Sequence, residues 1–287
     1  VRYAWDEKAA RFRNLLTFQR QWIEDGFSED CHGRAVWALG TCISRSKNDG
    51  FTQMAAELFE QALAPVASFT SPRAWAFALI GAHEYQQRFP GDRFSRSSME
   101  TLAVKLNGIY DENSGAEWKW FERSLSYSNA KIPHALIVSG RALSNEKMSK
   151  SGLDSLTWLA GVQTSSRGQF QPVGTDKIFE HWGKKSLFDQ QPIEAYATVS
   201  ACLEAYRSTK DKRWYDEAEK AFRWFLGAND LGLSLYDPIN GGCYDGLHMD
   251  RVNRNQGAES TIAFLLSLSE MTNVTNIVES FKEPILE

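Results

Sequence analysis

The sequence predicts an all-α protein, an α/α toroid in which helical hairpins form two concentric rings. Two observations lead to this fold class. Apolar residues recur at helical spacing in ten segments of the 287-residue chain, and these segments alternate between apolar on one side and apolar all round. One-sided helices face water and all-round apolar helices are buried. Ten helices make five hairpins, and a six-hairpin barrel would need one further pair before the N-terminus.

The ten segments follow one another with only short or polar connections between them. One-sided helices are expected at about 5–22, 51–62, 95–106, 147–162 and 214–226. All-round apolar helices are expected at about 35–45, 73–87, 130–143, after 188–195, and 256–271. Ser71-Pro72 marks a helix start, because proline is favoured at the first helical position. We interpret 1–272 as a single toroid domain and 273–287 as a C-terminal tail.

Composition narrows the class of protein. A hydrophobic content of 43% and a charged content of 24% provide a large core and exclude global disorder. The net charge of −4 gives no basic surface for nucleic acid. No apolar run is long enough for a membrane span, and no signal peptide is visible. The four cysteines form no Cys-x-x-Cys motif, so we expect a reducing, cytoplasmic setting. Because the chain starts at Val1, it is also compatible with a domain of a longer protein.

Polar and aromatic residues are concentrated where one-sided helices lead into buried ones. In a toroid these connections lie on one rim, above the N-termini of the inner helices, whose free N–H groups face the cavity. The richest connection, 115–133, contains Trp118, Trp120 and Tyr127 beside Glu117 and Glu122. Flat rings next to carboxylates suit the apolar and hydroxyl faces of a sugar. The alternative is that the rings fill the end of the helical bundle.

Three carboxylates are the candidate catalytic groups: Asp189, Glu259 and Glu117. Glycoside hydrolysis needs two carboxylates across the scissile bond, roughly 5–9.5 Å apart depending on the outcome. Asp189 and Glu259 lie at the starts of buried helices, where an acid also serves as a cap or dipole partner. Glu117 lies among tryptophans, where burial would raise its pKa. Its alternative role is a salt bridge to Lys119 or Arg123.

The candidate substrate-binding residues come from the same connections. They are Asp30, His32, Arg34, Trp118, Trp120, Glu122, Tyr127, Asn129, Gln190, Gln191, Glu194, Tyr244, Asp245, Asn255 and Gln256. His32 with Arg34 would bind a carboxylate or phosphate, or form a structural contact instead. No metal is expected, because histidine spacing matches no metal motif. A possible calcium loop has Ala116 where the sharp turn requires glycine. No cofactor is expected either.

Four segments together resemble a known family. They are Glu-Asp-Cys-His-Gly-Arg at 29–34, Trp-Lys-Trp-Phe-Glu-Arg to Ile-Pro at 118–133, Phe-Asp-Gln-Gln-Pro-Ile-Glu-Ala at 188–195, and Asn-Gln-Gly-Ala-Glu-Ser-Thr at 255–261. This pattern is similar to a bacterial family of (α/α)-barrel proteins encoded with, or fused to, group 1 glycosyltransferases and often labelled as such. The resemblance covers about 5–272 and implies an α/α toroid acting on carbohydrate. The family's usual Tyr-Asp-Asn-Ala reads Tyr-Ser-Asn-Ala here, so no carboxylate is available at Ser128.

These observations predict a carbohydrate-active protein that binds an oligosaccharide in a rim cleft. The favoured activity is glycoside hydrolase-like, with phosphorylase and epimerase as related classes. The alternative is a non-catalytic sugar-binding domain that serves a glycosyltransferase on the same or a neighbouring chain. The group 1 transferase activity itself is not expected of this chain, because βαβ units and glycine-rich turns are missing. A purely structural scaffold explains the polar, aromatic rim least well.

Overall fold

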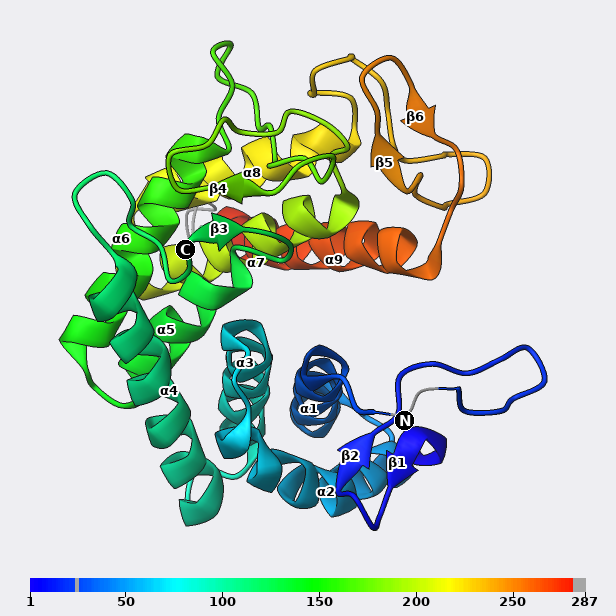
Figure 1. The fold of residues 1–287 in the computed structure, drawn as a ribbon, viewed down its shortest axis with the longest axis vertical. Coiled ribbons are helices and arrows are strands. Elements are labelled where there is room, and N and C mark those ends of the chain that lie inside the picture. Colours follow the sequence, from blue (N-terminus) through cyan, green and yellow to red (C-terminus); the bar gives the residue numbers. More distant parts are fainter. Residues whose placement is uncertain (24–25, 281–287) are drawn as a thin grey trace, which may run out of the picture. The chain divides into compact units, whose positions relative to one another are not determined.

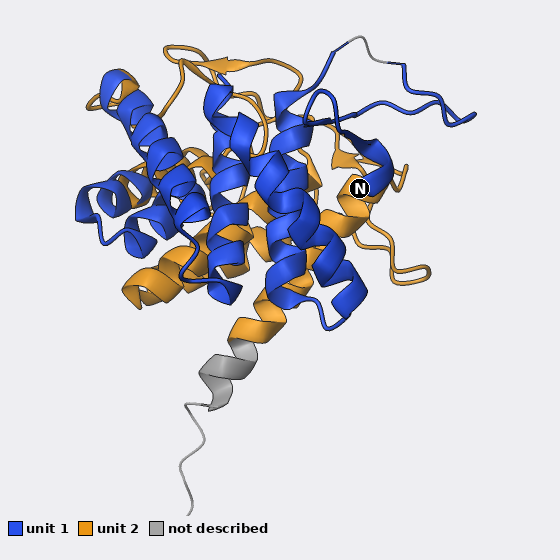
Figure 2. Ribbon diagram, turned by 90° about the horizontal axis from the view of Figure 1, so that it is seen from below, with its two compact units in different colours: residues 1–112, 135–152 blue, residues 113–134, 153–287 orange. Residues whose placement is uncertain are grey.

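The computed structural model describes residues 1–23 and 26–280, and it is predominantly α-helical (Figure 1). The chain divides into two compact units, which we call unit 1 and unit 2 (Figure 2). Unit 1 contains 1–112 and 135–152, and unit 2 contains 113–134 and the chain from 153 onward. The all-α class predicted from the sequence is confirmed.

Unit 1 holds the helices of the N-terminal part of the chain. Its elements are η1 Arg2–Ala4, β1 Trp5–Asp6, β2 Arg11–Phe12, α1 Glu29–Arg45, α2 Asp49–Leu63, η2 Ala64–Ser68, α3 Pro72–Arg88 and α4 Arg93–Asn113. Side-chain caps fix where α1, α2 and α3 begin, because each satisfies a backbone N–H of the first turn. Ser28, Asn48 and Ser71 are these caps. Pro72 occupies the first turn of α3, as predicted.

The helix predicted over 5–22 is wrong. This segment instead forms the β1–β2 hairpin, in which Trp5 pairs with Phe12, followed by an irregular loop. Asp6 closes the hairpin turn by accepting hydrogen bonds from the N–H groups of Lys8 and Ala9. The apolar residues do not share a buried face, since Phe12 is 2% exposed whereas Leu15 is 51% exposed. A helix here would lack the covered side that stabilises short helices.

Helices α1 and α3 lie side by side in unit 1 and approach closely through glycines (Figure 1). A Cβ atom at Gly40 would lie 2.1 Å from the carbonyl oxygen of Gly81. A Cβ atom at Gly81 would in turn lie 2.7 Å from the carbonyl oxygen of Val36. Only glycine allows the two backbones to meet at this distance.

Unit 2 holds the C-terminal helices and two further pairs of short strands. Its elements are β3 Ser124–Leu125, β4 Phe179–Glu180, α7 Pro192–Thr209, α8 Lys212–Phe225, β5 Gly246–Leu247, β6 Val252–Asn253 and α9 Ala258–Ser280. Helices α5 Lys131–Ala142 and α6 Glu146–Val162 contribute residues to both units. β3 pairs with β4, and β5 pairs with β6, both antiparallel.

The predicted contrast between one-sided and buried helices holds in the middle of the chain. In α7 every residue from Pro192 to Ala205 is buried, and α8 and α9 pack against it. Helix α8 is amphipathic, with Trp214, Ala218 and Phe225 buried and charged residues opposite. Helix α9 departs from the prediction, because some of its apolar residues, such as Ile262 at 54%, are exposed.

Helix α9 also continues past the predicted domain boundary at 272, as far as Ser280. The remainder of the predicted tail, 281–287, lies outside the described residues. Within the part of the chain that the structure describes, no helix combines the length and the apolar character that crossing a bilayer requires.

Candidate active site

A surface pocket of about 730 Å³ lies in unit 2, around the β5–β6 ribbon and the loop that follows α8. Its lining mixes apolar, aromatic, acidic and basic side chains. The lining residues are Leu233, Ser234, Tyr244, His248, Asp250, Arg251, Val252, Asn253 and Arg254. Its volume is within the range of small-molecule sites, and its lining is more polar than that of most such sites.

His248 in this pocket is hydrogen-bonded to Asp189, through Nδ1 of the imidazole and Oδ1 of the carboxylate. The side chain of His248 is 28% exposed and that of Asp189 is 44% exposed. An ionised carboxylate can only accept a hydrogen bond, so Nδ1 carries the proton. The lone pair of Nε2 is therefore left for other partners when the imidazole is neutral.

Backbone pairing explains why these two side chains meet. Gln190 and Leu247 form an antiparallel bridge and exchange both N–H···O bonds, at 3.0 and 2.8 Å. In this register Asp189 is directly opposite His248, and opposite residues project to the same face. The alternation along each strand turns Gln190 and Leu247 inward, where both are 0% exposed. Asp189 and His248 consequently share the outer face.

The Asp189–His248 pair is chemically suited to proton transfer. The carboxylate holds the imidazole in one tautomer and stabilises the imidazolium that forms when Nε2 takes up a proton. The same nitrogen can accept a proton from a substrate and later return one, which is what general acid–base catalysis requires. A paired imidazole and carboxylate at a polar pocket therefore provide a general base and general acid in one group.

The predicted residue Asp245 and a second acid of this loop, Asp237, stabilise the loop through hydrogen bonds within it. Asp245 accepts hydrogen bonds from Asn255 Nδ2 and, at 2.7 Å, from the N–H of Gly257. Burial alone would raise the pKa of Asp245, but these hydrogen bonds together hold it below its ordinary value. Gln256 likewise donates to Asp237 at 3.1 Å. Asp245, Asn255 and Gln256 are thus engaged with the loop itself, whereas Tyr244 lines the pocket.

A second polar cluster links the residues just before α5 to the first turn of α7. Glu194, 1% exposed, accepts hydrogen bonds from the Nδ2 and the backbone N–H of Asn129, at 2.9 and 3.3 Å. Lys131 is also buried, with its Nζ 4.2 Å from the ring centroid of Tyr196. The predicted residues Asn129 and Glu194 are brought together, in the interior of unit 2.

The tryptophans of the 115–133 segment are packing residues in this structure. Trp118 is 5% exposed and Trp120 is 0% exposed, so neither offers an open ring face to a sugar. Trp118 packs edge-on against Trp158 and Phe179, and its Nε1 donates to the carbonyl of Glu122 at 2.8 Å. This burial agrees with the alternative interpretation of the sequence, in which the rings serve packing and do not bind a sugar.

The remaining predicted residues of unit 2 lie near the surface. Glu117 is exposed and not enclosed by the tryptophans, which removes the physical basis for treating it as a buried proton donor. Glu259 is exposed in the first turn of α9. Tyr127 is 37% exposed, and Gln191 precedes α7 as its N-cap residue. A substrate role for these residues stays a prediction.

Three predicted residues belong to unit 1. Asp30 and Arg34 form an ion pair of 2.8 Å within α1. His32 is 0% exposed, accepting from the N–H of Phe12 at Nδ1 and donating to the carbonyl of Ala62 at Nε2, 2.7 Å away. Burial lowers the pKa of His32 to about 4. His32 therefore joins three segments of unit 1 as a neutral ring.

His248 was missing from the residues selected by sequence. Its position in the chain matches no motif, and it reaches Asp189 only because two loops 59 residues apart pair as a bridge. Such pairing leaves no periodic signal in the sequence. Among the described residues, no group of three or more His, Cys, Asp or Glu side chains is arranged to hold a metal ion.

Comparisons with known proteins support the fold. No family model matches this sequence, and a search of curated proteins gave no match. Similar solved structures include an unsaturated glucuronyl hydrolase specific for heparin, with 11% identity, a TM-score of 0.61 and coverage of 96% of this chain and 94% of that one. A cellobiose 2-epimerase from Spirochaeta thermophila has 12% identity, a TM-score of 0.64 and coverage of 96% and 78%. A sugar epimerase from a ruminal bacterium has 12% identity, a TM-score of 0.66 and coverage of 99% and 83%.

At these identities the likeness shows the fold alone. It places the chain in the all-α, α/α-toroid class predicted from its sequence. None of these three structures is described as a glycosyltransferase, and a transferase partner stays a prediction.

Proposed function

We propose that this protein is a carbohydrate-active enzyme whose Asp189–His248 pair transfers protons on a sugar bound in the unit 2 pocket. The observation that carries the proposal is the hydrogen bond between His248 Nδ1 and Asp189 Oδ1 beside that pocket. The favoured reaction class is epimerisation or isomerisation of a reducing sugar. The fold likeness to two sugar epimerases supports this class by analogy.

The His248 imidazole can act as the base in such a reaction. In the open-chain form of a reducing sugar, the C–H next to the carbonyl is acidic enough for a positioned base to remove its proton. Nε2 of His248 would take that proton, and Asp189 would stabilise the resulting imidazolium. Inversion follows when the intermediate turns its other face toward Nε2 and Nε2, after exchanging its proton with solvent, protonates that face of the carbon. Polar lining residues such as Tyr244 and Asn253 would bind the sugar hydroxyl groups.

Glycoside hydrolysis is the second candidate. Asp250 is a carboxylate that lines the pocket itself, and it forms an ion pair of 2.8 Å with Arg251. Hydrolysis would use two carboxylates, with one protonating the leaving oxygen and the other activating water or attacking the sugar. The fold likeness to a glucuronyl hydrolase supports this class in the same limited way.

The test is a substrate screen with product analysis. Purified protein is incubated with free hexoses, glucose- and mannose-based disaccharides and uronate-ended oligosaccharides, with and without phosphate. A product of unchanged length and altered configuration identifies an epimerase, whereas two shorter sugars identify a hydrolase, or a phosphorylase when phosphate is required. Asp189→Asn and His248→Gln are each expected to lower kcat at least 100-fold, in line with general acid–base catalysis.

Matched variants separate the candidates. Asp250→Asn should leave epimerase activity unchanged but should abolish hydrolase activity that depends on two carboxylates. Asp216→Asn removes an exposed ion pair with Lys212 on α8 and serves as the control with unchanged kcat. The proposal would be contradicted if wild type bound a sugar without turning it over and His248→Gln and Asp189→Asn bound it with the same affinity. That result would indicate a binding domain.

A further inference from the structure

We infer that Gln190, Trp224 and Asp230 form a positioning system for the Asp189–His248 pair, with Gln190 as its central residue. This inference rests on the proposed function, because it concerns the geometry of the same pair. Gln190 is 0% exposed and occupies the position between the predicted catalytic Asp189 and helix α7. From the sequence it was expected to bind substrate, but its side chain is directed into the protein.

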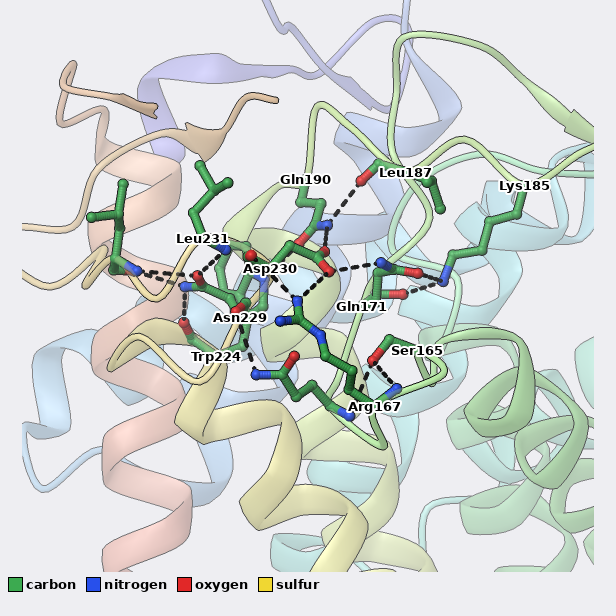
Figure 3. Close-up of polar contacts among 12 residues, drawn as sticks. Ser165, Arg167, Gln171, Lys185, Leu187, Gln190, Trp224, Asn229, Asp230 and Leu231 are labelled. Carbon is green, nitrogen blue, oxygen red and sulfur yellow. Dashed lines mark hydrogen bonds and ion pairs between the residues drawn. The ribbon is translucent and has the colours of Figure 1, made fainter. Parts of the chain in front are cut away.

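Every polar atom of Gln190 has a partner. Its backbone N–H and carbonyl bond to Leu247, the residue before His248. Its side-chain Nε2 donates to the carbonyl of Leu187 at 2.8 Å and to Asp230 Oδ2 at 2.5 Å. Its Oε1 accepts from Trp224 Nε1 at 2.7 Å. Figure 3 shows the side-chain contacts of Gln190 with Leu187 and with Asp230 in the loop after α8.

The chemistry of the partners permits one orientation of the Gln190 amide. An indole N–H is a donor only and an ionised carboxylate is an acceptor only. Trp224 therefore requires Oε1 on its side, and Asp230 requires Nε2 on the other. A flipped amide would place two donors against each other and two acceptors against each other. Because both partners are thus satisfied at once, the side chain of Gln190 is held in one position.

Asp230 is fixed in turn by a second amide. Gln171 Nε2 donates to Asp230 Oδ1 at 2.9 Å, and Lys185 Nζ donates to Gln171 Oε1 at 3.1 Å (Figure 3). The ammonium of Lys185 is a donor only, so the Gln171 amide also has a single orientation. Arg167 contributes a hydrogen bond of 3.3 Å to the carbonyl of Asp230. Asp230 is consequently held from both sides.

The system acts on the pair through the backbone bridge. Asp189 and His248 are the next residues along the two strands from Gln190 and Leu247, so a shift of Gln190 shifts both side chains. The contact at Gly246 shows how closely the bridge is packed, since a Cβ atom there would lie 2.8 Å from the carbonyl oxygen of Gln190. Misplacement of a catalytic group by about 1 Å can cost about 100-fold in rate.

Three variants each remove one or more hydrogen bonds of this system. Gln190→Met keeps the length of the side chain and removes its amide. Trp224→Phe removes the indole N–H and keeps an aromatic ring. Asp230→Asn keeps the shape of the carboxylate and replaces one acceptor by a donor. The control is Gln163→Met, because Gln163 is likewise 0% exposed in unit 2 but bonds to Thr198 on α7, apart from the bridge.

The readout is the tautomer of the His248 imidazole, measured by long-range ¹H–¹⁵N NMR on ¹⁵N-labelled protein without substrate. The His248 signal is assigned with the His248→Gln variant. In wild type the Nδ1–H form should predominate, and Asp189→Asn defines the signal without the carboxylate. Gln190→Met and Trp224→Phe should move His248 at least half of the way toward the Asp189→Asn signal, and Gln163→Met should leave it unchanged.

Activity gives a second readout on any sugar found in the screen. Gln190→Met should lower kcat about tenfold to 100-fold with little change in KM. Variants that lose thermal stability but retain the wild-type His248 tautomer would overturn the inference, and if Gln190→Met does not fold, Trp224→Phe decides the question. Because the NMR experiment uses no substrate, a failed sugar screen would count against the proposed function and leave this test standing.

Discussion

The stability of unit 1 should depend on pH through His32. Its ring is fully buried, and its nitrogens accept from Phe12 and donate to Ala62, which requires the neutral form. Burial lowers the pKa of His32 from 6.5 to about 4 in the folded protein. Between these values the unfolded chain binds a proton that the folded chain does not, so the free energy of unfolding rises with pH.

The size of the effect follows from the same pair of pKa values. Each pKa unit corresponds to about 1.4 kcal/mol, so His32 should remove roughly 3 kcal/mol of stability as the pH falls from 7 to 4. The assay is urea unfolding of wild type and His32→Gln across this range. Glutamine can still donate to Ala62 but does not titrate. The stability difference between the two proteins should therefore shrink or reverse at low pH, because only wild type loses stability through His32. A difference that stays constant from pH 7 to pH 4 would show that His32 is not held neutral by burial.

Three further predictions concern packing and charge. Gly40→Ala should destabilise the protein by about 1–3 kcal/mol, because its Cβ would lie 2.1 Å from the carbonyl oxygen of Gly81. The control is Gly161→Ala, since no atom lies within 4 Å of a Cβ at that position. Equal melting temperatures of the two variants would contradict the close α1–α3 contact. Gly246→Ala should displace the Gln190 bridge and lower kcat about tenfold or more on a sugar substrate; unchanged kinetics would show that the bridge tolerates a side chain. Burial lowers the pKa of Lys185 from 10.5 to about 8, so between these values the unfolded chain binds more protons than the folded chain. Wild type should therefore gain stability relative to Lys185→Met as the pH rises from 8 to 10.5. Denaturant unfolding of both proteins at the two pH values measures this gain, and an unchanged difference would contradict it.

Most helices could be predicted from the sequence because the spacing of their apolar residues indicates which faces are buried. Most residues of α7 from Pro192 to Ala205 are apolar or small, Glu194 and Glu204 being exceptions, and all of them are buried. Ser71 and Pro72 mark the start of α3 by local chemistry that needs no tertiary information. The segment 5–22 failed for the opposite reason. Its apolar spacing suits a helix, but the side chain of Asp6 closes a hairpin turn that this spacing does not reveal.

The candidate site was only half predictable. Asp189 stood out because an acid precedes a buried helix, but its partner His248 is set by pairing between distant loops. Gln190 was selected as a polar residue beside Asp189, whereas the structure turns it inward through the alternation of the bridge. Trp118 and Trp120 were selected as rings near carboxylates, and a sequence cannot tell a ring that faces solvent from one that fills a core.

In the proposed reaction, His248 exchanges protons with a carbon of a sugar. The most direct measurement is deuterium incorporation from D₂O, followed by ¹H NMR, with the reducing sugars of the screen as substrates. Wild-type protein should place deuterium on the carbon next to the carbonyl, and His248→Gln should reduce the rate at least 100-fold. Turnover of a sugar by wild type with no deuterium on carbon would contradict proton transfer at carbon and leave hydrolysis as the activity of the pocket.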